Sequence, residues 1–131
     1  MENRLRADLI TWLRNDPALS EINAMEEESP LSASPPWLGL SATGSTDWGT
    51  KDRRGREVRS ALELETRTDE TEADAHLLYA IEQRVLDLPP FGTDYELASV
   101  RFLRARSEQR ENNRRGALLE FRFRLFHSFM E

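Results

Sequence analysis

Few side chains in this 131-residue chain have the types and spacing that catalysis requires. Its two histidines, His76 and His127, are far apart in the sequence, and it has no cysteine. Because a zinc site usually draws several His or Cys ligands at short spacing, we expect no metal site. The chain also lacks a G-x-S-x-G motif, a P-loop and a G-x-G-x-x-G motif. A Ser-His-Asp arrangement stays open, since its members can be far apart in a sequence.

Two groups of carboxylates are candidates for cation binding or acid–base chemistry. Three consecutive glutamates at 26–28 could bind a hard cation, but such a run in a Ser/Pro-rich loop is more often solvated. Glu63 and Glu65 would share one face of a strand, and Arg122 and Arg124 would lie on the same face of the sheet. Cross-strand ion pairs explain these four residues more simply than a catalytic carboxylate pair does. The sequence therefore predicts a charged sheet face that contains all four.

Positive charge gathers at 51–59 and again at 101–124. Two polar segments, an arm at 45–57 and a turn at 107–116, carry part of this charge. Both could contact phosphates. Neither has the interleaved aromatic residues of single-strand binders, however, and the net charge of −6 opposes long-range attraction to nucleic acid. Contact with a partner subunit and a solvated turn are the other two interpretations. The candidate interface residues are Trp48, Lys51, Arg53, Arg54, Arg56, Arg110, Arg114 and Arg115.

Trp48 is the candidate apolar anchor of such an interface, because aromatic residues concentrate at interface hot spots. The alternative is that its ring folds back on its own hairpin. The arm is also longer than the roughly two to five residues usual for hairpin loops. We expect the segments 45–57 and 107–116 to be mobile in the monomer and to become ordered on contact with a partner.

Hydrophobic periodicity predicts the elements that position these segments. A stripe of Leu5, Leu9 and Leu13 indicates an amphipathic helix, and the alternation in "ALLEFRFRLFHSF" indicates a half-buried strand. The predicted elements are, in order, a helix at 3–15, a Glu/Ser/Pro-rich loop at 24–36, strands at 37–43 and 57–67, a helix at 72–88, and strands at 95–106 and 117–129. The order α-β-β-α-β-β predicts an α+β fold, a two-layer sandwich in which both helices pack on one face of a four-stranded, largely antiparallel sheet.

Length and composition predict a single domain spanning residues 1–131, with mobile loops at about 24–36, 45–57 and 107–116. A hydrophobic fraction of 38% is enough for one modest core. No stretch approaches the roughly 18 apolar residues of a transmembrane helix, and the N-terminus has no signal-peptide pattern. We therefore expect a soluble protein that is made in a cytoplasm and does not contact a membrane.

Four stretches of the chain share a pattern with one protein family. The most specific is Asp47-Trp48 followed by "RRGRE" at 53–57. It is supported by "DPAL" at 16–19, by "EADAHLLYAIEQRVLDL" at 72–88 and by the closing strand at 115–124. In these residues the chain resembles the tail-terminator (tail-completion, head–tail joining) proteins of long-tailed phages and phage-like gene transfer agents. The loop at 24–36 departs from the family pattern, so no contact is assigned to it.

The resemblance implies a structural virion protein without catalytic residues or cofactors. Members form a ring, expected here to be hexameric, that caps the tail tube, terminates its polymerisation and joins it to the head side. The implied partners are other copies of the chain, the tail tube protein and the head-side connector or stopper protein. DNA is expected to pass through the channel without specific binding. The implied location is the head–tail joint of a virion or phage-like particle assembled in a bacterial cytoplasm.

Two alternatives stay open at this point. A head–tail adaptor or stopper at the same joint would follow the twelvefold symmetry common among head-side adaptors. A small nucleic-acid-binding regulatory protein would instead show a salt-dependent affinity for DNA.

Overall fold

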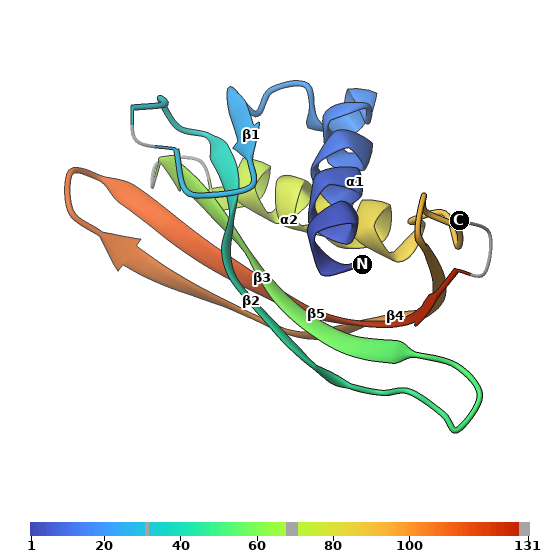
Figure 1. The fold of residues 1–131 in the computed structure, drawn as a ribbon. Coiled ribbons are helices and arrows are strands. Elements are labelled where there is room, and N and C mark those ends of the chain that lie inside the picture. The colour runs from blue at the N-terminus through green and yellow to red at the C-terminus, as the bar shows by residue number, and fades with distance from the viewer. Residues whose placement is uncertain (31, 68–70, 129–131) are drawn as a thin grey trace.

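The chain folds into a curved sheet that is covered on one face by two helices (Figure 1). The computed structural model describes all residues except 31, 68–70 and 129–131, and at 71–73 it describes the backbone alone. The helices are α1 (Glu2–Arg14), the short 3-10 helix η1 (Pro17–Leu19) and α2 (Thr71–Leu86). The strands are β1 (Ala24–Glu26), β2 (Trp37–Asp47), β3 (Gly55–Arg67), β4 (Tyr95–Arg110) and β5 (Arg114–His127).

The sheet has five strands in the order β1-β2-β3-β5-β4. It is mixed, because β1 runs parallel to β2 while all other neighbours are antiparallel. The prediction of four strands was therefore wrong by one, although the α+β class is confirmed. β1 lies inside the predicted loop at 24–36, where Met25 is buried and pairs with Leu38. Three residues are too few to show a two-residue period, so only the pairing with β2 reveals this strand.

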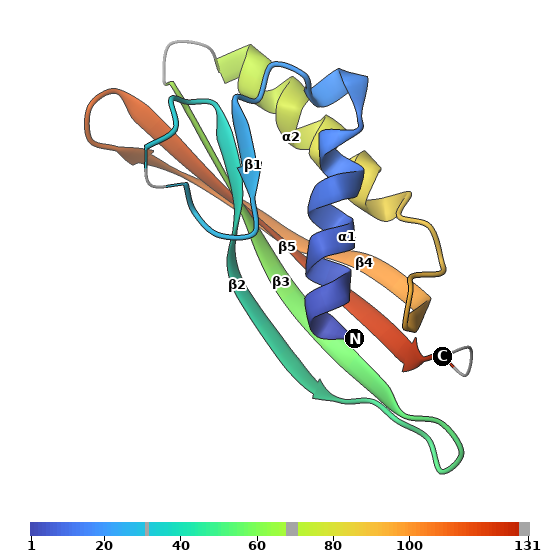
Figure 2. The same ribbon diagram turned by 45° about the horizontal axis from the view of Figure 1, so that its top comes forward.

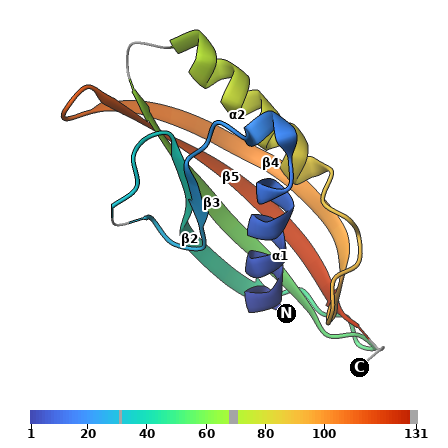
Figure 3. The ribbon, with the colours of Figure 1, turned by 90° about the horizontal axis from the view of Figure 1, so that it is seen from above.

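Both helices lie on the same face of the sheet, as the sequence predicts (Figures 1 and 2). The predicted stripe of α1, formed by Leu5, Leu9 and Leu13, is buried. α2 buries Leu77, Ile81 and Val85 in the same core. A view from above shows the two helices side by side over the sheet (Figure 3).

Trp12 and Arg84 tie α1 to α2. The indole Nε1 of Trp12 donates a hydrogen bond to the carbonyl oxygen of Arg84 at 2.7 Å. In return, Nε of Arg84 donates to the carbonyl oxygen of Trp12 at 2.9 Å, and its guanidinium lies 3.4 Å from the centroid of the indole ring. The reciprocal bonds and the cation–π contact fix the angle at which the helices meet.

The core is built on the antiparallel pairing of β3 with β5. Val58 lies opposite Phe123 and Leu62 lies opposite Leu119, and all four side chains are buried. Successive side chains of a strand point to opposite faces of the sheet. The charged residues between them therefore lie on the face away from the helices, which we call the open face.

Both hairpins run further than the sequence predicts, so the predicted loops at 45–57 and 107–116 are shorter than expected. β2 and β3 extend into the arm and leave residues 48–54 as their connection, and β4 and β5 leave 111–113. Asn112 and Asn113 form this second turn with φ angles of 60° and 58°, a left-handed conformation that asparagine tolerates. The polar strand ends carry no apolar alternation, so backbone pairing rather than a hydrophobic pattern extends them.

Replacing Phe121 with alanine tests the contribution of the core. The ring is fully buried and meets Phe102 edge to face, with 5.6 Å between ring centroids. We expect the free energy of unfolding, measured by urea denaturation, to fall by about 3–5 kcal/mol. The matched variant Phe91→Ala changes a side chain that is 72% exposed and should alter stability by less than about 0.5 kcal/mol. Equal losses in the two variants would contradict this assignment of the core.

Candidate functional site

The open face of the sheet carries most of the predicted site residues. Near the turn between β4 and β5, Glu63 and Glu65 of β3 bind arginines from that hairpin. Nη1 of Arg110 lies 2.7 Å from Glu63 and 3.3 Å from Glu65. Nη1 of Arg114 lies 3.2 Å from Glu65. We call Glu63, Glu65, Arg110 and Arg114 the carboxylate–arginine cluster.

The carboxylates of this cluster also accept hydrogen bonds from uncharged donors. Nε1 of Trp37 donates to buried Glu65 at 2.9 Å, and Oγ of Ser29 donates to Glu63 at 2.9 Å. Partial burial opposes the charge on Arg110, but the hydrogen bonds that it donates to Glu63 and Glu65 outweigh this effect and raise the pKa of the guanidinium. The cluster is therefore a set of mutually paired ions that stabilises the hairpin.

A second ionic cluster lies at the opposite end of the open face, around Glu57. Its carboxylate lies 3.1 Å from Nε of Arg124 and 4.0 Å from Nε of Arg122. The hydrogen bond from Arg124 lowers the pKa of Glu57. Arg122 and Arg124 do lie on the same face as Glu63 and Glu65, but they pair with Glu57 because the register places Glu57 directly opposite Arg124.

Trp48 lies at the base of the connection between β2 and β3, where its ring packs on the end of the sheet. The centroids of Trp48 and Phe126 are 4.8 Å apart, and the guanidinium of Arg124 lies 5.3 Å from the Trp48 centroid. Arg53 stacks on the other ring, 4.3 Å from the centroid of Phe126. The ring of Trp48 is thus folded back on its own sheet and half-buried.

The four predicted cations of the arm divide into two pairs. Arg53 binds Glu96 at 3.4 Å and donates to the carbonyl oxygen of His127 at 3.2 Å. Arg56 lies 3.5 Å from Glu2, at the start of α1. Lys51 and Arg54, in contrast, are exposed. Two of the cations therefore hold the arm against the sheet, and two face solvent.

The three arginines predicted together at the second turn lie on different faces of the sheet. Arg110 and Arg114 belong to the carboxylate–arginine cluster. Arg115 lies opposite Thr66, whose Oγ1 donates to Asp74 of α2 at 2.8 Å, so Arg115 is on the helix side. The turn therefore does not present a single patch of three cations.

A row of exposed arginines on β4 was not among the predicted interface residues. Arg101, Arg104 and Arg106 all lie on the open face, and Arg104 forms an ion pair with Glu120. A strict two-residue period would put Arg101 and Arg104 on opposite faces. The register shift between Phe102 and Arg104 brings them to the same face. The arginine spacing was visible in the sequence, but the bulge was not.

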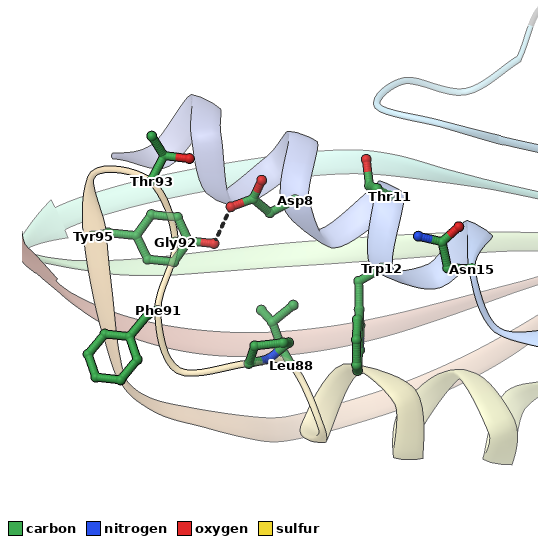
Figure 4. A pocket seen from close by; sticks show the side chains of 10 residues that line it. Asp8, Thr11, Trp12, Asn15, Leu88, Phe91, Gly92, Thr93 and Tyr95 are labelled. Carbon is green, nitrogen blue, oxygen red and sulfur yellow. Dashed lines mark hydrogen bonds between the residues drawn. The ribbon is translucent and has the colours of Figure 1, made fainter.

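A pocket of about 430 Å³ lies between α1 and the connection from α2 to β4 (Figure 4). Its lining is mostly neutral and includes Trp12, Leu88 and Phe91. The hydroxyl of Tyr95 donates to Asp8 at 2.7 Å, and burial together with this bond raises the pKa of Tyr95. Because the one carboxylate in the lining is engaged by Tyr95, the pocket offers little for acid–base catalysis.

Among the side chains that the structure describes, at 1–30, 32–67 and 74–128, no group of three or more His, Asp or Glu is placed to hold a metal ion. In the same ranges, no helix has the length and apolar character needed to cross a membrane.

Comparisons with known proteins point to one family. Residues 7–126 match the family described as tail completion protein gp17. A chain from the virion of a native gene transfer agent particle superposes with a TM-score of 0.82 at 19% identity, over 95% of this chain and 96% of that chain. A second solved structure superposes with a TM-score of 0.55 at 7% identity, over 99% of this chain and 94% of that chain. No curated protein sequence matches. At such low identities the superpositions show a shared fold alone.

Replacing Glu65 with glutamine tests the carboxylate–arginine cluster. The amide oxygen can still accept from Trp37, but the charge that pairs with Arg110 and Arg114 is lost. We expect the free energy of unfolding to fall by about 1.5–3 kcal/mol, because a buried charge-assisted network is broken. The matched variant Glu120→Gln removes the partner of the exposed Arg104 and should cost no more than about 1 kcal/mol. Urea denaturation of both variants measures the difference, and equal costs would argue against a structural role for the cluster.

Proposed function

The chain belongs to the family of tail completion protein gp17, and on that premise we propose that it forms a ring that caps the tail tube. Membership makes it a structural tail protein and a virion component of phage-like particles, not an enzyme. The proposed ring has six copies, terminates polymerisation of the tube and joins it to a head-side connector or stopper protein. The match over residues 7–126 is the observation that carries this proposal.

The distribution of charge supports assembly into a ring. A head-to-tail ring needs two different, complementary surfaces on each subunit. Exposed glutamates at 26–28 lie at the end of β1 on one side of the sheet, and exposed arginines line β4 on the other. Opposite charges steer such surfaces together, and like charges disfavour the wrong pairings.

We propose the connection at 48–54 as a contact to the tube or to the next subunit. It projects beyond the helices at one end of the sheet (Figure 1). Trp48 fixes its base by packing on Phe126, while Lys51 and Arg54 are exposed. In this proposal Lys51 and Arg54 meet acidic groups of the partner, and Trp48 adds apolar area at the edge of the contact.

The other candidate interface residues have supporting roles in this proposal. Arg53 and Arg56 hold the arm through carboxylates of their own chain. Arg110 and Arg114 stabilise the second hairpin, which projects at the opposite end of the sheet. Arg115 lies on the helix side, so we assign it no contact with a partner.

A ring of such subunits would let DNA pass without holding it. The net charge of −6 opposes non-specific attraction to the duplex. Arginines of the open face are also engaged by glutamates in both ionic clusters, which reduces the positive charge available to phosphates. We therefore propose a passage without specific binding to DNA.

The ring is tested by native mass spectrometry of the purified protein, alone and with the tail tube protein. We expect a closed six-copy species and, in electron micrographs, tubes that stop growing when the protein is added. Twelve copies would favour a head-side adaptor, and salt-dependent affinity for DNA would favour a nucleic-acid-binding protein. A protein that stays monomeric and leaves tube length unchanged would overturn the proposal.

Replacing Trp48 with alanine tests the arm. Loss of the stacked ring removes about 0.5–1.5 kcal/mol of local stabilisation, so the arm should detach from the sheet while the core stays folded. We expect weaker capping, seen as longer tubes in electron micrographs, at an unchanged far-ultraviolet circular dichroism spectrum. Trp48→Phe keeps an aromatic ring on Phe126 and should cap nearly as well as the wild type. Normal capping by Trp48→Ala would exclude the arm as a contact.

A further inference from the structure

The outer edge of β2 is open to pairing with another strand. β1 covers that edge only at residues 37–39, so at 41–47 it has no strand partner among the described residues. Residues 42–46 include no charged side chain and no proline, they pair regularly with β3, and all of them are exposed. Proteins normally protect such edges with charges, prolines or bulges. Between the register shift at Leu40/Ala42 and Asp47, this edge has none of these devices. In a chain that is 32% charged, such a stretch calls for an explanation.

The opposite edge of the sheet, formed by β4, has a different character. Residues 90–92 cover its first part, where the Leu97 amide donates to the Pro90 carbonyl oxygen at 2.6 Å. Beyond that point the edge carries exposed Arg101, Arg104 and Arg106 and has two register shifts. This edge resists pairing with an arbitrary strand but suits a partner that accepts arginine.

The register of the sheet relates the two edges row by row. Arg101 lies in the same row across the sheet as Gly44, and Arg104 lies in the same row as Ala42. Arg106 shares its row with Glu26 of β1. If a second copy stands beside the first at the same height, Arg101 and Arg104 of its β4 therefore meet small residues of β2. The row of Arg106 is already covered by β1, which ends in the acid Glu26.

The strand directions also suit this contact. Each of the three steps from β2 through β3 and β5 to β4 is antiparallel, so β2 and β4 run in opposite directions. A rotation about an axis along the strands then brings β4 of the next copy antiparallel to β2. Such a rotation, repeated, is the symmetry operation of a ring.

We propose that β2 of one copy pairs with β4 of the next, so that the sheets join edge to edge around the ring. This proposal rests on the proposed function and names its subunit contact. Gly44 and Ala42 leave room for the side chains of Arg101 and Arg104, and an added Cβ at Gly44 would meet no atom within 4 Å. Glutamates at 26–28 and Asp47, whose side chain is 82% exposed, supply opposite charge at the two ends of the open edge.

The charges also select against the two symmetric alternatives. Pairing β2 with β2 would bring the acids at 26–28 and Asp47 of the two copies together. Pairing β4 with β4 would bring two rows of arginines together. Both arrangements give closed dimers, whereas the unlike pair gives a ring. The unlike edges therefore favour assembly in which each copy uses one edge of each kind.

A disulfide between the edges tests the contact directly, because the chain has no cysteine of its own. In one copy, positions 44 and 101 are three strand spacings apart, about 14 Å, and a disulfide requires Cα atoms within about 7 Å. Oxidised Gly44→Cys/Arg101→Cys should therefore give a ladder of covalent oligomers on a denaturing gel, ending at the closed ring. Gly44→Cys alone and Arg101→Cys alone should give no species larger than a dimer.

A charge series at position 44 adds a second measurement. Gly44→Lys places a cation against Arg101 of the next copy, and we expect loss of the ring in native mass spectra. Gly44→Asp places a carboxylate there and should keep the ring. Gln83→Lys adds the same charge on the exposed side of α2 and should also keep it.

The outcomes separate the contact from the ring itself. Suppose that the wild type forms a ring, the double variant gives no covalent ladder, and Gly44→Lys keeps its ring. That result would overturn the edge contact and leave the proposed function standing. A wild-type protein that forms no ring, alone or on tubes, would overturn both.

Discussion

The register of β3 against β5 is the constraint on which the rest of the structure depends. It places Val58 opposite Phe123 under the helices and Glu57 opposite Arg124 on the open face. A slip of one residue would exchange the two faces along the whole pair. The charged residues would then be buried under the helices, where ionised groups are costly to desolvate. A single register thus secures both the core and the ionic face.

The two hairpins built on this pair extend past the helices at opposite ends (Figure 1). No helix covers these ends, so burial of apolar area contributes little there. At each end, a different set of side-chain contacts takes the place of this burial. The carboxylate–arginine cluster joins β3 to the hairpin of β4 and β5. At the other end, Trp48, Phe126 and Arg53 stack and tie the connection at 48–54 to β5. The hairpin ends are therefore shaped by specific polar and aromatic contacts, which suits surfaces that meet partners.

Much of this arrangement could be predicted from the sequence, because alternation reports the face of each strand residue. It placed Glu63, Glu65, Arg122 and Arg124 correctly on one charged face. It could not say which acid meets which arginine, since that depends on register between strands, and register has no signature in a single strand. The three-residue β1 was missed for lack of a period. The row of arginines on β4 was not among the predicted interface residues, because a bulge changes the phase of the alternation after Phe102. The packing of Trp48 on Phe126 joins residues far apart in sequence, so it is visible only in the folded chain.

The order of strands has a consequence for solubility as well as for assembly. An unprotected edge such as that of β2 would invite aggregation in an isolated domain. Here the acids at 26–28 and at Asp47 flank the open edge, so another β2 edge approaches against repulsion. The complementary edge, β4, is at the far side of the same sheet and cannot reach it within one copy. In the proposed contact, the distance between the β2 and β4 edges keeps a monomer from pairing with itself. It also leaves every copy with one β2 edge and one β4 edge for its two neighbours. Charge then limits pairing to unlike edges. The rotation angle between neighbouring copies decides how many copies close the ring.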